Sequence, residues 1–158
     1  MPTGPRAAPR RGPAVLLVDT SVWVEVLRRP ARLTLADVGD FDEIVTCLPV
    51  VQEVLQGFRD ELAFRKAREA MLSLPIVESP LGRAVFEEAV GLYRAARRAG
   101  FTPRSAVDCL IAACALRHGL TVVHVDRDYS ALARFAPLSQ RALSTDAPPP
   151  PAGTGGRQ

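Results

Sequence analysis

The chain carries, close to its start, a short apolar run that ends abruptly at a carboxylate. Residues 14–18 are Ala-Val-Leu-Leu-Val without polar alternation, and Asp19 follows directly. Apolar runs of this kind are typical of strands buried on both faces, as in parallel α/β sheets. In open parallel sheets, ligands bind beyond the carboxyl ends of the strands. We therefore expect Asp19 to face a functional crevice.

The rest of the chain alternates between short apolar runs and segments of helical periodicity. Further strands are expected at 43–47, 75–78, 121–125 and 137–141. Helices are expected at 21–27, 49–72, 82–99 and 102–116, with a single turn within 32–41 and a short helix from 129 to about 135. Strands that alternate with helices predict a three-layer α/β/α domain with a mainly parallel sheet of four or five strands.

Composition predicts one domain with two tails. A chain of 158 residues is long enough to bury one core. The Pro-, Arg- and Gly-rich residues 1–13 lack the apolar segment of a secretory signal, so we expect a disordered lead-in, followed by one globular domain at 14–143. The Pro- and Gly-rich residues 144–158 are expected to be a disordered tail. No stretch approaches the roughly 20 apolar residues that span a bilayer.

The charge of the chain indicates which partners it is able to bind, and its cysteines indicate the redox state of its compartment. The chain has 20 basic and 17 acidic residues, a formal charge of +3, and nearly every basic residue is Arg. This balance permits nucleic acid as a partner without requiring it. The three cysteines, Cys47, Cys109 and Cys114, lack zinc-type spacing and have apolar neighbours. Buried thiols in a reducing cytoplasm are the expectation.

Several acidic residues interrupt an apolar pattern or end a strand: Asp19, Glu53, Asp108 and Asp126, with Asp128 two positions later. Ionised carboxylates in apolar settings are costly unless they are paired or bound to a metal. Several at one crevice repel one another and raise one another's pKa values. Mg²⁺ or Mn²⁺, which prefer oxygen ligands, would remove this repulsion.

Each acid also has a structural interpretation. Asp19 is able to cap the helix that follows it, and Asp128 is expected to cap a turn that begins at Tyr129. Glu53 is expected in the first turn or so of a helix, near the N-terminus, where it suits the dipole. Asp108 is expected in the middle of an apolar helix, where neither explanation applies. A buried salt bridge to an arginine is its remaining structural interpretation.

Four segments resemble the acidic motifs of PIN-domain ribonucleases: residues 17–22 (Leu-Val-Asp-Thr-Ser-Val), 53–57 (Glu-Val-Leu-Gln-Gly), 108–113 (Asp-Cys-Leu-Ile-Ala-Ala) and 125–129 (Val-Asp-Arg-Asp-Tyr). They follow the family's order and strand or helix context. The similarity covers residues 15–141, and the size most resembles VapC toxins of bacterial toxin–antitoxin pairs.

The resemblance implies a role for each matching residue. Thr20 corresponds to the hydroxyl that supports the site, and Asp128 to the second acid of the last motif. The residues that correspond to the catalytic, metal-holding acids are Asp19, Glu53, Asp108 and Asp126. The implied cofactor is Mg²⁺, with Mn²⁺ as a substitute.

The chain departs from the family pattern at two positions. His124 stands where Thr or Ser is usual, and Tyr129 where Phe is common. Neither departure removes a carboxylate. Both His118 and His124 are expected to be structural.

The function that fits is metal-assisted hydrolysis of an RNA phosphodiester by a VapC-type toxin. A solitary PIN-domain RNA-processing nuclease and a non-catalytic PIN module that binds RNA or protein remain alternatives. A phosphatase resembling haloacid dehalogenases would need an Asp where this chain has Ser21.

The partner surfaces follow from basic and apolar positions. A cluster of arginines is expected either to contact RNA phosphates or to form a solvated helix face: Arg94, Arg97, Arg98 and Arg104. The resemblance implies a homodimer and a cognate antitoxin. Two apolar sets are candidates for these contacts: Val22, Trp23 and Val26, and Val54, Leu55 and Phe58.

Overall fold

The computed structural model describes residues 14–146 and contains a five-stranded sheet in the order β3-β2-β1-β4-β5. Every pair of neighbouring strands is parallel. The strands are β1 (Leu16–Val18), β2 (Ile44–Cys47), β3 (Ile76–Val77), β4 (Thr121–His124) and β5 (Ser139–Ala142). The predicted α/β class with a parallel sheet is confirmed, including the fifth strand.

The register of the central strands brings their carboxyl ends to one edge of the sheet. Strand β1 is fully buried, and Val18 at its end pairs with Val123 of β4. The backbone N–H of Asp19 continues this ladder by donating to the carbonyl of Val123 at 2.9 Å. Because neighbouring strands run parallel, the residues that follow β1, β2 and β4 emerge at one edge.

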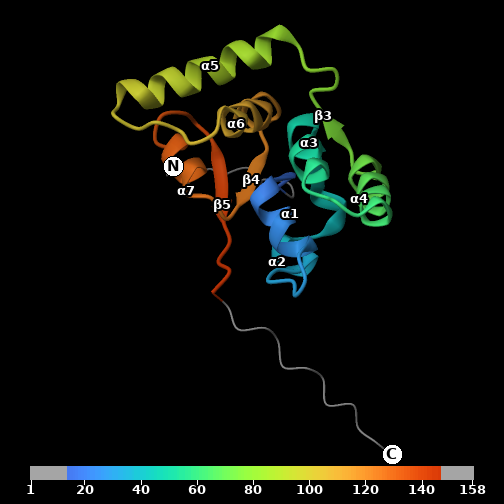
Figure 1. The fold of residues 1–158 in the computed structure, drawn as a ribbon. Coiled ribbons are helices and arrows are strands. Elements are labelled where there is room, and N and C mark those ends of the chain that lie inside the picture. Colours follow the sequence, from blue (N-terminus) through green and yellow to red (C-terminus); the bar gives the residue numbers. More distant parts are fainter. Residues whose placement is uncertain (1–13, 147–158) are drawn as a thin grey trace, which may run out of the picture.

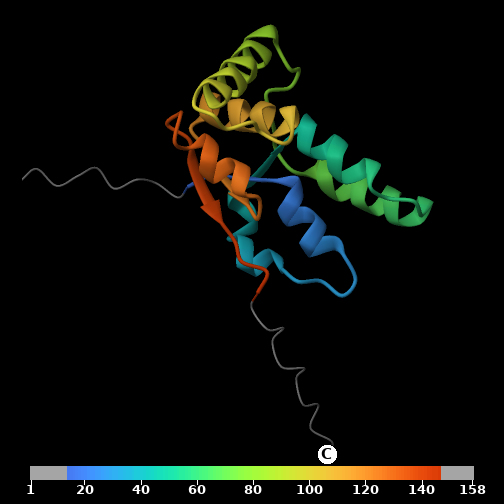
Figure 2. The same cartoon turned by 60° about the vertical axis from the view of Figure 1, so that its left-hand side comes forward.

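Seven α-helices in the described residues flank the sheet. Helix α5 packs along α6, whereas α1, α3 and α4 form a second group that lies apart from α5 in both views (Figures 1 and 2). The helices are α1 (Thr20–Leu27), α2 (Leu35–Val38), α3 (Leu48–Gln56), α4 (Glu61–Ser73), α5 (Arg83–Arg98), α6 (Ala106–His118) and α7 (Arg127–Leu132). A 3₁₀ turn, Phe41–Glu43, precedes β2.

The single helix predicted at 49–72 is wrong, because the chain forms two helices there. Helix α3 ends at Gln56, and α4 begins at Glu61. Gly57 is a poor helix former, and Asp60 caps α4 by accepting the backbone N–H of Ala63 at 2.8 Å. The local cap outweighs the continuous apolar spacing.

Two helix starts also differ from the prediction. Helix α6 begins at Ala106 instead of residue 102, because Ser105 caps it by accepting the N–H of Val107 at 3.1 Å. Helix α7 begins at Arg127, and its cap is Asp126. The predicted cap, Asp128, lies inside the helix.

None of the helices within residues 14–146 is long and apolar enough to cross a membrane. The predicted lead-in, 1–13, and most of the predicted tail, 147–158, lie outside the described residues. Residues 144–146, the first part of that tail, carry no helix or strand. The domain boundaries therefore stay predictions.

Candidate active site

Asp19 lies at the end of β1 and uses both carboxylate oxygens. Oδ2 accepts the backbone N–H of Ser21 at 2.9 Å and its hydroxyl at 2.5 Å, so Asp19 does cap α1. Oδ1 accepts the hydroxyl of Tyr129 at 2.6 Å. The side chain is buried, with 3% of the residue exposed. Capping is therefore only one of its roles, because the second oxygen is held by a residue 110 positions away.

Tyr129, one of the departures from the family pattern, orients this carboxylate. Its side chain is fully buried. Burial, and then the negative charge of Asp19, raise the pKa of the Tyr129 phenol well above its usual value. The phenol therefore stays protonated near neutral pH and donates its hydrogen bond to Asp19.

Glu53 lies in the second turn of α3, because the helix begins at Leu48. This agrees with the expected place near the helix N-terminus, although the first turn, where the helix dipole acts most strongly, ends before Glu53. Its Oε2 accepts the hydroxyl of Thr20 at 2.8 Å. Thr20 follows Asp19, so this bond links the first two acidic segments. The supporting role that the family resemblance implies for Thr20 stays a prediction.

Asp108 occupies the first turn of α6, and the expectation that it sits in mid-helix is wrong. It is buried, and its pKa rises from its ordinary value of 3.8 to about 7. Burial is the largest cause, followed by four negative charges, in the order Asp19, Asp126, Asp128 and Glu53. The carboxylates that the sequence singles out therefore act together on one group.

Asp126 and Asp128 follow β4 and share one arginine. Asp126 caps α7 by accepting the N–H of Asp128 at 3.0 Å, and its Oδ1 pairs with Nη2 of Arg104. Asp128 is buried and accepts the backbone N–H of Arg104 at 2.8 Å and its Nε at 3.3 Å. Sequence reasoning groups Arg104 with the surface arginines and misses this pairing with the acids.

The donor set fits a hard divalent cation in its chemistry, since it consists of carboxylate oxygens whose charges raise the pKa of Asp108. Within residues 14–146, however, no three His, Cys, Asp or Glu side chains converge closely enough to form a ready-made metal site. The acids instead bind Ser21, Tyr129, Thr20 and Arg104. Metal binding would therefore require these carboxylates to come closer together than they lie in this structure.

The histidines do not join the acids. His124 is buried on β4, and its Nε2 lies 2.6 Å from Oε1 of Gln140 on β5. Its ring packs against Tyr129 at 5.1 Å between centroids. His118 ends α6 and lies 3.1 Å from Glu78. These contacts support the structural roles that the sequence predicts for both.

The cysteines are free and buried, as the sequence predicts. Burial, and then the charge of Asp108, raise the pKa of Cys109 to about 11. This thiol therefore stays protonated near neutral pH and does not act as a nucleophile.

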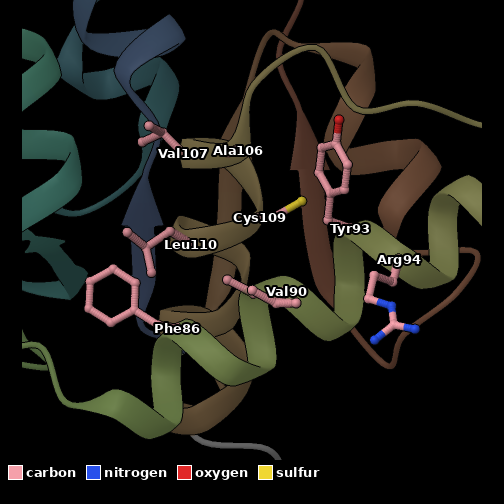
Figure 3. Close-up of a pocket in the computed structure, with 9 residues that line it drawn as sticks. Phe86, Val90, Tyr93, Arg94, Ala106, Val107, Cys109 and Leu110 are labelled. Carbon is pink, nitrogen blue, oxygen red and sulfur yellow. The ribbon is translucent and has the colours of Figure 1, made fainter.

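The other candidate arginines lie apart from the acids. Arg94, Arg97 and Arg98 are exposed on α5, and only Arg104 of the four pairs with the acidic side chains in the described residues. Arg94 borders an apolar groove of about 390 Å³ between α5 and α6 (Figure 3). The groove carries Phe86, Val90 and Leu110 and no carboxylate, so it is separate from the candidate active site.

Comparison with known proteins identifies the family. A family profile described as PIN domain matches residues 16–135, which include all four acidic segments. The chain belongs to the PIN-domain family. Ribonuclease VapC11 of Mycobacterium tuberculosis is 38% identical to this PIN domain over 130 residues, which cover 78% of the chain and 96% of that relative. The PIN domain therefore groups with the VapC ribonucleases.

Solved structures agree with this fold. VapBC2 from Rickettsia felis, solved bound to a promoter DNA fragment, matches with a TM-score of 0.67 at 15% identity over 82% of this chain and 98% of that chain. VapBC-5 from Mycobacterium tuberculosis, a member of the VapBC toxin–antitoxin systems, matches with a TM-score of 0.63 at 21% identity, over 83% and 100% of the two chains. At these identities the likeness concerns the fold.

Proposed function

We propose that this PIN domain is a Mg²⁺-dependent endoribonuclease and the toxin of a VapBC-type pair. The observation that carries the proposal is the rise in the pKa of Asp108 to about 7, to which four further acids contribute after burial. Crowded, buried carboxylates are costly to ionise unless a cation offsets their charge. The VapC ribonuclease relatives support RNA as the substrate. The free, buried cysteines fit a reducing cytoplasm as the setting.

The residues that would hold the cation are Asp19, Glu53, Asp108 and Asp126, directly or through water. Bound Mg²⁺ would supply Lewis-acid stabilisation of the charge on a phosphodiester. The protein orients the ligands: Ser21 and Tyr129 fix Asp19, and Thr20 fixes Glu53. One carboxylate would accept the proton of the attacking water, because no histidine in the described residues contacts these acids.

The proposed protein partners are a cognate antitoxin and a second copy of the chain. Support for the antitoxin comes from the VapC relatives and from an apolar cavity of about 190 Å³. The cavity is lined by side chains of α1, α2 and α4, including Trp23, Val26 and Leu35. Leu35 and the nearby Phe41 are partly exposed, at 38% and 56%. Apolar surface of this kind is suited to a partner segment.

RNA cleavage by the purified protein tests the enzyme proposal. Wild-type protein is expected to cut RNA with Mg²⁺, to stop when EDTA is added, and to resume when Mg²⁺ is restored. Asp108→Asn should abolish cleavage and growth inhibition with the fold intact. The matched control is Asp42→Asn, which changes an exposed Asp outside the site.

Two outcomes would contradict the proposal. Normal cleavage by Asp108→Asn would remove this residue from the site. RNA binding without cleavage by the wild type would favour a non-catalytic binding module. Mapping new RNA 5′ ends after induced expression would identify the substrate, and an adjacent gene for a DNA-binding protein would support a toxin over a solitary nuclease.

A further inference from the structure

Asp126 and Asp128 differ in what their oxygens do. The side chain of Asp128 is 5% exposed, and both of its oxygens accept from Arg104, one from the backbone N–H and one from Nε. The side chain of Asp126 is 27% exposed. Its Oδ1 accepts hydrogen bonds from the backbone N–H of Asp128 and from the guanidinium of Arg104, whereas its Oδ2 makes no hydrogen bond within residues 14–146. Asp126 thus keeps an open oxygen, and Asp128 does not.

Asp128 also fixes the path of the chain into α6. Residues 99–105 connect α5 to α6, and the N–H of Arg104 is held at 2.8 Å by Asp128 just before the cap residue, Ser105. This contact ties the end of the connection to α7, on which Asp128 lies. Asp108 lies in the first turn of α6, so Asp128 acts on its position through the backbone.

The guanidinium of Arg104 is anchored along one edge and exposed along the other. Its side chain is 69% exposed. Nε and Nη2 contact the two acids, while Nη1 makes no hydrogen bond in the described part of the chain. An arginine guanidinium carries its positive charge at any ordinary pH. A fixed, charged fork with a free N–H edge matches the geometry of a phosphate.

We propose that Asp128 is a positioning residue that holds Arg104 across the mouth of the acidic site, where the free edge of the guanidinium binds a backbone phosphate of RNA. This inference rests on the proposed function for the identity of its ligand. The inference gives the two acids of the last motif different roles. Asp126 belongs with the cation-holding carboxylates, and Asp128 positions the side chain of Arg104.

Binding of a fluorescent single-stranded RNA oligomer to the full-length protein in EDTA, at several KCl concentrations, tests the contact. Arg104→Gln should weaken binding about tenfold and lower the salt slope by about 0.7, because one phosphate contact is lost. Arg104→Lys keeps the positive charge but loses the forked guanidinium. Its RNA affinity should lie between those of wild type and Arg104→Gln. The control, Arg83→Gln, removes the same charge at the far end of α5, where the side chain is 90% exposed, and should stay within about twofold of wild type.

A double-mutant cycle tests the positioning role of Asp128. In an Asp128→Asn background, Arg104→Gln should cost less than about threefold in RNA affinity, because the guanidinium then keeps only its contact with Asp126 and is held less firmly. Mn²⁺ titration by calorimetry supplies the second measurement. Asp128→Asn should keep the Mn²⁺ affinity within about threefold, whereas Asp126→Asn should lose about tenfold or more.

The outcomes separate this inference from the nuclease proposal. RNA binding by Arg104→Gln equal to that of wild type overturns the phosphate contact and leaves Arg104 as a counter-charge to the acids. Equal loss of Mn²⁺ affinity in Asp128→Asn and Asp126→Asn makes Asp128 a ligand and overturns its positioning role. If Asp128→Asn fails to fold, the two Arg104 variants still decide the phosphate contact. If RNA binding depends on Arg104 but the wild-type protein does not cleave RNA, the nuclease proposal is overturned and the phosphate contact stands.

Discussion

At the scale of single residues, Asp108 is the group on which the other acids act. Burial and four neighbouring carboxylates raise its pKa to about 7, from an ordinary value of 3.8. In the metal-free protein, the carboxyl of Asp108 therefore holds its proton to a higher pH in the folded state than in the unfolded chain. Its ionised form is costly unless a cation lies beside it.

Stability should consequently depend on pH in a defined direction. Because the folded pKa lies above the unfolded one, ionisation of Asp108 lowers the free energy of unfolding as pH rises from about 4 to about 7, after which the loss is complete. Asp108→Asn removes this cost. In EDTA it should raise the free energy of unfolding at pH 8 by about 2 kcal/mol, and by clearly less at pH 5. Urea unfolding of both proteins at pH 8 and pH 5 measures this change in stability. A change at pH 8 no larger than that at pH 5, or a loss of stability at pH 8, would contradict the raised pKa of Asp108.

Sequence reasoning finds the acids at this scale but not their partners. Asp108 and Asp19 stand out because each interrupts or ends an apolar pattern. The bond from Tyr129 to Asp19 joins residues 110 positions apart, and Arg104 reaches Asp126 across 22 positions. Such pairings depend on where the elements meet in space, which periodicity does not encode.

At the scale of elements, helix ends are set by local capping. The apolar positions of 49–72 keep helical spacing across the break, so the pattern predicts one helix where two form. Asp60 caps the second helix, and Leu62, which continues the apolar spacing, is 61% exposed. Capping likewise moves the start of α6 to Ala106, which brings Asp108 into the first turn.

Removing the Asp60 cap should weaken α4. Asp60→Ala should lower the free energy of unfolding by about 1 kcal/mol, because the N–H of Ala63 loses its acceptor. Asp60→Asn retains a good capping side chain and serves as the control. Urea denaturation of the three proteins provides the comparison. Equal stability of Asp60→Ala and wild type would mean that packing alone sets the boundary between α3 and α4.

At the scale of the whole molecule, the parallel sheet brings the acids together. Asp19 follows β1 and Asp126 lies just beyond β4, its immediate neighbour, while Glu53 and Asp108 lie on α3 and α6, which contact one another. The alternation of strands and helices predicts this class of sheet, but strand order and register follow from packing. The sequence therefore singles out these carboxylates as candidates, whereas their mutual effect at one edge is seen only in the fold.

The central claim is that these carboxylates share a divalent cation, and calorimetric titration with Mn²⁺ tests it most directly. Wild-type protein and the Asp42→Asn control should bind Mn²⁺ with the same affinity. Asp19→Asn, Glu53→Gln and Asp108→Asn should each bind at least about tenfold more weakly. Absence of Mn²⁺ binding to the wild type, or wild-type affinity in all three variants, would contradict the shared cation.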